Sequence, residues 1–126
     1  MKKMYLLFSH ILTQEQFIDA RENLGVEEFI KLPQELQELW SNIPPDIVDI
    51  SSYLKPIKQW LQDHIKLGDI ALIQGDFGAT CKMVSFVKEK GAKAVYATTK
   101  RDVQEKLTNG KIIKTSVFQH IRFREF

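Results

Sequence analysis

Short, wholly apolar runs alternate with longer segments of helical periodicity over the first three quarters of the chain. Residues 4–8 and 70–73 are continuous apolar runs of four or five residues, a pattern typical of strands that are buried on both faces. Residues 29–32, which precede Pro33, and residues 93–97 predict two further strands. Strands separated by helices in this way indicate an α/β domain with a largely parallel sheet.

The segments between the strands carry apolar residues at helical spacing. Thr13 opens the first of them, and Gln16 three residues later completes a capping-box pattern that marks a helix start. Gly25 ends that helix, since glycine adopts the left-handed conformation that closes helices. The same periodicity predicts three further helices. They cover residues 34–40, a segment from about Ser52 to a stop at Gly68, and residues 79–90. In the second of these, Pro56 is expected to lie in the first turn.

Beyond Arg101 the apolar positions follow a period of two. Residues 103–107 and 111–118 flank Asn109-Gly110, the strongest short-range signal for a β-hairpin. The alternation continues in the tail and places Phe118, His120, Arg122 and Arg124 on one face, with Gln119, Ile121 and Phe123 on the other. Residues 1–126 are therefore predicted to form one Rossmann-like three-layer sandwich with an antiparallel C-terminal hairpin.

Composition narrows the class of protein without changing this picture. The 126 residues fit one domain, and 44% hydrophobic with 27% charged residues is ordinary for a soluble globular chain. The longest apolar runs fall far short of the ~20 residues that span a bilayer. No signal-peptide pattern follows Met1, so we expect a cytoplasmic protein. Cys81 is the single cysteine and no two histidines lie at ligand spacing, so we expect no disulfide, no metal site and no cofactor.

Charge is distributed unevenly along the chain. Residues 1–66 hold seven Lys and Arg against ten Asp and Glu, whereas residues 100–126 hold seven against three. The basic C-terminal end suits an anionic ligand, although a solvated charged face has the same composition.

One polar segment follows the strand at residues 70–73 and is the best local candidate for a site. It comprises Gln74, Gly75, Asp76, Phe77, Gly78, Ala79 and Thr80. The segment lacks both the three-glycine dinucleotide fingerprint and the lysine of a Walker loop, which argues against a cradled nucleoside triphosphate. Backbone N–H groups at a helix start and side-chain oxygens still suit a phosphodiester or a ribose. The alternative is a plain turn in which Asp76 binds local amides.

Two further polar segments follow predicted strands. Thr98, Thr99, Lys100 and Arg101 follow residues 93–97 as a predicted second polar loop, for which the alternative is a helix N-cap followed by solvated charges. Ser9 and His10 follow the first strand, and the imidazole suits acid–base chemistry near neutral pH. The alternative for His10 is a side chain that caps or packs on the next helix. Parallel strands would bring all three segments to the carboxyl edge of the sheet, where ligands bind.

Arginine recurs on the last predicted strand. Arg122 and Arg124, with His120, form a predicted basic stripe that suits phosphate recognition, although charges also protect exposed edge strands from aggregation.

With these segments in view, the chain resembles the small stand-alone CRISPR-associated proteins of type III systems that are related to CARF sensor domains, several of which are ring nucleases. The similarity extends over nearly the full length, including residues 36–45 and 53–56. The resemblance implies a homodimer whose two-fold axis passes through a pocket for cyclic oligoadenylate, most often the four-adenosine ring. It also implies metal-independent cleavage, in which a ribose 2′-OH attacks its own 3′-phosphate and leaves a 2′,3′-cyclic phosphate. Destruction of this messenger would switch off type III CRISPR signalling.

The resemblance and the residue pattern together predict specific roles. We expect Ser9, His10, Lys100 and Arg101 to be catalytic, and residues 74–80 with Thr98, Thr99 and Arg122 to bind the ligand. In-line attack by the ligand's own hydroxyl requires positioning and charge stabilisation more than a protein nucleophile. We expect neither a membrane nor DNA as a partner. Two alternatives remain: a non-catalytic sensor or sponge for the same messenger, and an interaction protein whose hairpin and Arg tail bind a protein or RNA.

Overall fold

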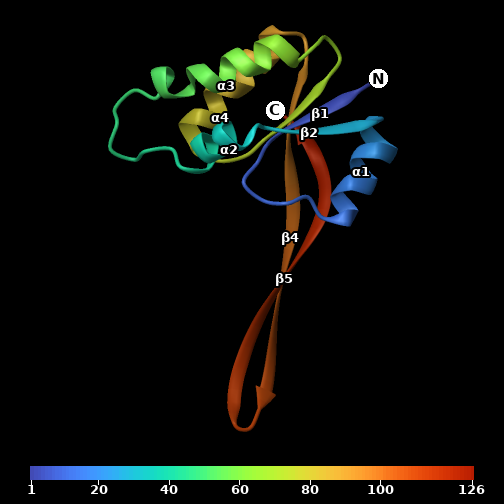
Figure 1. Ribbon diagram of the computed structural model, residues 1–126. Helices are drawn as coiled ribbons and strands as arrows, with labels where there is room; N and C mark the ends of the chain where they lie inside the picture. Colours follow the sequence, from blue (N-terminus) through green and yellow to red (C-terminus); the bar gives the residue numbers. More distant parts are fainter.

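A computed structural model describes all residues, 1–126, and confirms the α/β class (Figure 1). The elements in chain order are β1 (Lys3–Leu7), α1 (Gln14–Leu24), β2 (Glu28–Lys31), α2 (Gln34–Ser41), α3 (Ser51–His64), β3 (Ile70–Ile73), α4 (Phe77–Glu89), β4 (Lys93–Thr108) and β5 (Lys111–Glu125). They form one five-stranded sheet of order β2-β1-β3-β4-β5. The first four strands are parallel, and β5 is antiparallel to β4.

Helices cover both faces of the sheet. Figure 1 shows α1 on one side and α2, α3 and α4 on the other. Successive strand residues point to opposite faces, so Met4 and Leu6 pack under α1 whereas Tyr5 and Leu7 pack under the other three helices. This double burial is the reason that the central strands read as uninterrupted apolar runs. None of the four helices has both the length and the apolar character that crossing a bilayer requires.

The start of α1 matches the predicted capping box. Thr13 Oγ1 accepts a hydrogen bond from the Gln16 backbone N–H at 3.2 Å, and Gln16 Oε1 accepts one from the Thr13 N–H at 2.9 Å. Gly25 closes the helix with a φ of 71°, as expected. The predicted position of Pro56 is wrong by one turn, because α3 begins at Ser51 and Pro56 is its sixth residue. A proline here removes one backbone hydrogen bond, and the helix persists because its apolar face is buried.

The predicted second polar loop is wrong, because residues 98–101 lie inside β4. That strand continues for 16 residues, and the C-terminal segment pairs with it from Val95 to Thr108. The partner strand satisfies the backbone groups of these residues, so no turn forms where the apolar pattern ends. The turn itself is confirmed at Asn109 and Gly110, whose φ values of 52° and 75° fit a two-residue hairpin turn of type I′.

A β-bulge interrupts the pairing of β4 with β5. Arg122 pairs with Thr98 and His120 pairs with Thr99, which leaves Ile121 without a partner across the ladder. One extra residue reverses the alternation of side chains along β5. His120 therefore faces α1 together with Phe123, and the predicted stripe of His120, Arg122 and Arg124 on one face is wrong.

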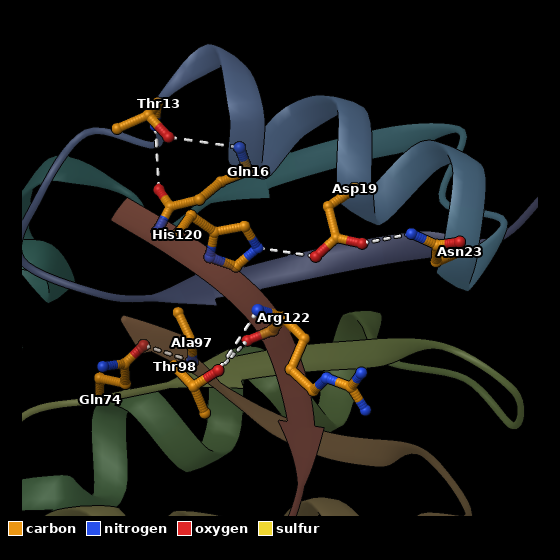
Figure 2. Close-up of polar contacts among 9 residues, drawn as sticks. All are labelled: Thr13, Gln16, Asp19, Asn23, Gln74, Ala97, Thr98, His120 and Arg122. Atoms are coloured by element: carbon orange, nitrogen blue, oxygen red, sulfur yellow. Dashed lines mark hydrogen bonds and ion pairs between the residues drawn. The ribbon is translucent and has the colours of Figure 1, made fainter. Parts of the chain in front are cut away.

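The bulge buries His120 against α1 (Figure 2). Its side chain is only 5% exposed, and Nε2 lies 2.7 Å from Oδ2 of Asp19. The other Asp19 oxygen accepts a hydrogen bond from the Asn23 side chain at 2.6 Å. Burial by itself raises the pKa of Asp19, but the hydrogen bonds from Asn23 and His120 and the charges of His120 and Arg122 outweigh it, so this pKa lies below its ordinary value.

The lowered pKa of Asp19 predicts a pH-dependent contribution to stability. A carboxyl group whose pKa is lower in the folded than in the unfolded state stabilises the fold above its unfolded pKa of about 3.9, and the contribution is lost as the pH falls through the folded value. We expect Asp19→Asn to reduce the free energy of unfolding by about 1 to 3 kcal/mol near pH 6, the range for hydrogen bonds to charged groups. The difference from wild type should shrink below about pH 4.

Urea unfolding across this pH range measures the effect. Glu22→Gln serves as the control, because Glu22 is an exposed carboxylate on the same helix. A deficit of Asp19→Asn that stays constant down to pH 3 would contradict the assignment.

Candidate ligand site at the carboxyl edge of the sheet

The order of the strands locates one crevice on the sheet. From β1 the chain passes through α1 to β2 on one side, and from β3 it passes through α4 to β4 on the other, with the two helices on opposite faces. The carboxyl ends of β1 and β3 are therefore the topological switch point, where open α/β sheets bind ligands. The segments that leave these ends carry Ser9 and His10 after β1 and Gln74 to Asp76 after β3.

A pocket of about 260 Å³ lies beside the end of β1. Phe8 and Phe17 give it aromatic walls, and Ser9, His10, Lys31 and Gln37 supply its polar groups. Ser9 and His10 lie in the loop that follows β1, Lys31 is the last residue of β2, and Gln37 lies on α2. Such a mixture of apolar walls and a few polar groups is typical of sites for small organic ligands.

Hydrogen bonds position the polar side of this pocket. Gln37 Nε2 on α2 donates to the Phe8 carbonyl and to Ser41 Oγ, both at 3.1 Å. Ser41 Oγ lies 3.0 Å from Ser9 Oγ, so the two hydroxyls share a hydrogen bond. His10 is exposed, and its ring packs edge-on against Phe8 with centroids 5.4 Å apart. The imidazole is thus held at the pocket's rim without a hydrogen bond that would occupy its nitrogens.

Gln74 connects the elements around the crevice. Its backbone N–H donates to the Leu7 carbonyl at 3.0 Å, and its carbonyl accepts from Trp40 Nε1 at 3.1 Å. Its side-chain Oε1 accepts a hydrogen bond from the Ala97 N–H at 2.8 Å, as Figure 2 shows. The residue therefore ties β1, α2 and β4 to the end of β3. Its side-chain oxygen holds the sheet together rather than facing a ligand.

Asp76 has the role that the plain-turn alternative gave it. Its Oδ2 accepts from the Ala79 N–H at 3.0 Å and caps α4, which begins at Phe77 rather than at residue 79. The first N–H groups of α4 lack partners within the helix and carry its positive dipole, so this end still suits an anion. Phe77 is 93% exposed beside them, and Thr80 Oγ1 is a buried hydroxyl without a hydrogen-bond partner.

Of the candidate site residues at positions 98–101, Thr98 and Arg101 make side-chain hydrogen bonds within the β4–β5 hairpin. Thr98 Oγ1 donates to the Arg122 carbonyl at 3.0 Å and accepts from the Arg122 N–H at 3.2 Å, which closes the bulge (Figure 2). Arg101 donates to Ser116 Oγ and lies over the Phe118 ring. The Lys100 side chain makes no hydrogen bond or ion pair, and the strand carries it ~10 Å beyond Ala97.

The remaining predicted residues divide between two places. Thr99 pairs with His120 at the root of the hairpin and is exposed. Arg122 lines a different cavity, of about 320 Å³, together with Asp19 and Asn23 on α1. The structure therefore places Ser9 and His10 after β1 and residues 74–76 after the neighbouring strand β3, whereas Arg122 lies on the flank of α1.

Sequence reasoning missed three residues of the pocket. Lys31 is the last residue of β2, and its position at a strand end was a usable signal. Gln37 and Ser41 lie four residues apart on α2 and so share one face of that helix. No sequence pattern indicated that this face meets the end of β1, because the contact depends on how α2 packs.

The strand order defines the class: a small α/β protein with the 2-1-3-4-5 strand order of flavodoxin-like sheets and a candidate ligand site at the β1/β3 switch point. Within that class the chain belongs to the family described as "Uncharacterized protein MJ1673 family", which matches residues 2–124. It is similar to the uncharacterized protein MJ1673 of Methanocaldococcus jannaschii, with 59% identity over 126 residues, which are 100% of this chain and 98% of that protein. No solved structure matches the chain.

The glycines of the β3–α4 segment predict opposite effects on stability. A Cβ at Gly75 would lie 3.1 Å from the Trp40 indole, a buried ring that the hydrogen bond to Gln74 holds in place. We therefore expect Gly75→Ala to lower the free energy of unfolding by about 1 to 3 kcal/mol, the usual cost of overpacking. Gly78→Ala is the control: its Cβ meets atoms at an ordinary 3.5 Å inside α4, so we expect a gain of up to about 1 kcal/mol. Chemical denaturation measures both, and equal effects would contradict this packing.

The bulge predicts a specific role for the Thr98 hydroxyl. Thr98→Val keeps the shape of the side chain and removes both hydrogen bonds to Arg122, so we expect a loss of about 1 kcal/mol on unfolding. Thr99→Val is the matched control, because the neighbouring hydroxyl makes no hydrogen bond within the chain and is exposed. Thermal unfolding of the two variants gives the comparison. Equal melting temperatures would mean that the Thr98 hydroxyl does not stabilise the bulge.

Proposed function

We propose that this protein is a cytoplasmic ring nuclease that binds cyclic oligoadenylate and cleaves it without a metal ion. The expected substrate is the four-adenosine ring. One observation carries the proposal: Ser9 and His10 line a pocket at the carboxyl end of β1, and the neighbouring parallel strand β3 leads into the amide-bearing start of α4 at the same edge of the sheet. This is the arrangement that the resemblance to CARF-related ring nucleases leads one to expect. Cleavage would end type III CRISPR signalling by removing the messenger.

The proposed chemistry uses the ligand's own ribose as the nucleophile. Its 2′-OH attacks the adjacent 3′-phosphate, the bond to the 5′-oxygen of the next nucleotide breaks, and a 2′,3′-cyclic phosphate remains. His10 is the group that moves a proton, because its exposed imidazole makes no hydrogen bond within the chain and histidine is the side chain that most often acts as a general acid or base. The Ser9 hydroxyl and the α4 amides stabilise the charge that develops on the phosphate oxygens. Of the two predicted cations, Lys100 is free of hydrogen bonds and ion pairs, whereas the Arg101 guanidinium is bound to Ser116.

The pocket is suited to part of the ring rather than to all of it. A volume of about 260 Å³ lies just below the range of about 300 to 1,000 Å³ for whole drug-sized ligands. Its aromatic walls fit an adenine base, and the polar groups Lys31 and Gln37 can orient that base or its ribose. A cyclic tetra-adenylate has two-fold symmetry, so a homodimer would offer each half of the ring an equal pocket.

The second candidate is a protein that binds the same messenger without cleaving it. It is favoured by the number of predicted site groups that are already bonded within the chain, namely the side chains of Gln74, Asp76, Thr98 and Arg101. Such a protein would sense or sequester the ring. The two candidates share the pocket and differ only in chemistry, so a cleavage assay separates them.

The test is single-turnover cleavage of cyclic tetra-adenylate in the presence of EDTA, with products resolved by chromatography. We expect linear oligoadenylates with cyclic phosphate ends, at a rate that EDTA leaves unchanged. His10→Ala should slow cleavage by about 100-fold or more, the usual contribution of general acid–base catalysis, while binding changes little. His64→Ala is the control, since His64 is exposed on α3, stacks on Trp60 and lies outside the pocket.

Four results would speak against the leading candidate. If the wild-type protein binds the ring but returns it uncut, the non-catalytic candidate replaces the enzyme. If cleavage depends on added metal, or if His10→Ala and His64→Ala slow it equally, the proposed chemistry is wrong. Absence of any binding to cyclic tri-, tetra- or hexa-adenylate would overturn both candidates.

A further inference from the structure

The outer part of the β4–β5 hairpin projects away from the rest of the molecule (Figure 1). We call residues 99–118 the arm, and every one of them is exposed to solvent. The arm contains only two strands, which pair with each other and with nothing else. A two-stranded ribbon is marginally stable at best in water and usually needs a third strand or a packed face. The arm is therefore expected to have a partner.

The two faces of the arm differ in polarity. Residues directly opposite each other in an antiparallel pair share a face, so the pairs Leu107–Ile112 and Arg101–Phe118 and the residue Val103 lie on one side. The four apolar residues of this set are between 54% and 76% exposed. We call this side the apolar face of the arm. On the opposite face only Ile113 and Val117 are apolar, among Lys, Asp, Gln and Thr residues.

We propose that the apolar face of the arm packs on a second copy of this chain, in a groove at the carboxyl edge of the partner's sheet. The groove has a volume of about 360 Å³ and lies between residues 43–50 and the start of α4. Its apolar wall includes Pro44, Ile47 and the fully exposed Val48, and its charged groups are Asp49, Asp76 and one cation, Lys82. The groove is apolar with one more acidic than basic group, which matches a ribbon that is apolar and carries a net positive charge.

Charge favours contact between an arm and a body rather than between two arms. The arm has five Lys and Arg residues against two Asp and Glu, a net charge of +3. Residues 1–98 have eleven against thirteen, a net charge of −2. Two arms packed together would place like charges side by side, whereas an arm on a body joins opposite charges. The arm is therefore expected to contact residues 1–98 of the second copy rather than its arm.

The fold also places the arm and the groove so that each of two chains can insert its arm into the groove of the other. β4 runs parallel to β3, so the arm leaves the body at the carboxyl edge, and α4 and the groove begin at that same edge. With these edges facing each other across a two-fold axis, each chain gives one arm and receives one, and the contact closes as a dimer. Each chain would contribute the eight residues of its apolar face and the ten residues that line its groove, which is close to the ~20 residues on one side of a stable interface.

The positive charge of the arm alone would also suit RNA, but its apolar face argues for a protein surface. Nucleic-acid interfaces are more polar than protein interfaces and are dominated by cations. Here an apolar stripe occupies one face, and Glu105 and Lys114 on the same face pair with each other at 3.7 Å. The groove shares the start of α4 with the proposed ring site, so the test of the inference measures association of the protein without ligand and separately from ring cleavage.

The test compares apolar substitutions on the two faces of the arm in the full-length protein. Leu107→Thr with Ile112→Thr removes two side chains from the apolar face, and Ile113→Thr with Val117→Thr removes two from the opposite face. Thr keeps the strand propensity, and all four positions are exposed, so neither variant should disturb the fold. We expect the first pair to raise the dimer dissociation constant at least tenfold in sedimentation analysis, and the control to change it by no more than about twofold.

Two further measurements probe the receiving surface. Val48→Thr alters a fully exposed groove residue, so it should weaken the dimer severalfold without changing the melting temperature. Salt screens charges, so an arm on an acidic body should dissociate more readily as NaCl rises from about 50 to about 500 mM. Contact between two basic arms would instead become tighter.

Clear outcomes would overturn the inference. The first is a wild-type chain that stays monomeric at about 50 µM, a concentration that reveals even weak association. The second is an equal effect of the two double variants on the dissociation constant. The third is a dimer whose dissociation constant falls as the salt concentration rises. A monomer that binds single-stranded RNA, with loss of binding when the arm is substituted, would assign the arm to RNA instead.

Discussion

The pairing of β5 with β4 is the interaction on which the rest of this structure depends. It runs from Val95 to Thr108, and only its inner part belongs to the sheet that the helices cover. The inner part completes the sheet beside β3. The outer part carries the chain into solvent as an arm. A single register shift between Thr98 and Thr99 separates the two parts and turns His120 toward Asp19, so the bulge anchors the hairpin on α1.

The candidate site is positioned by a small number of shared hydrogen bonds. Gln74 joins the ends of β1 and β3 to Trp40 and to β4, and Gln37 joins α2 to the segment after β1. The Gln74 side chain, which the sequence suggested as a ligand group, is used in this way, whereas the side chains of His10 and Lys31 line the pocket without a hydrogen bond to the rest of the chain. A site of this kind favours positioning and charge stabilisation over nucleophilic chemistry by the protein.

The arm and the site share one edge of the sheet, and this arrangement connects the two proposals physically. If two chains associate through this edge of the sheet, their two pockets lie side by side, which suits a ligand with two-fold symmetry. The basic arm would then lie near the negative charge of such a ligand as well as near the acidic groove. Binding of the ligand and association of two chains would each favour the other, because both need the same edges to face each other.

The sequence by itself determined the local structure and the class of fold. Uninterrupted apolar runs indicated buried parallel strands, Thr13 and Gln16 specified the start of α1, and Asn109-Gly110 specified the hairpin turn, because each depends on neighbours within a few residues. Only the tertiary structure decided that residues 98–101 are a strand, that Ile121 is the bulged residue and that His120 is buried. These outcomes depend on which distant segment supplies hydrogen-bond partners. The pocket formed by Ser9, Lys31 and Gln37 was hidden for the same reason, since three separate elements must pack before their side chains meet.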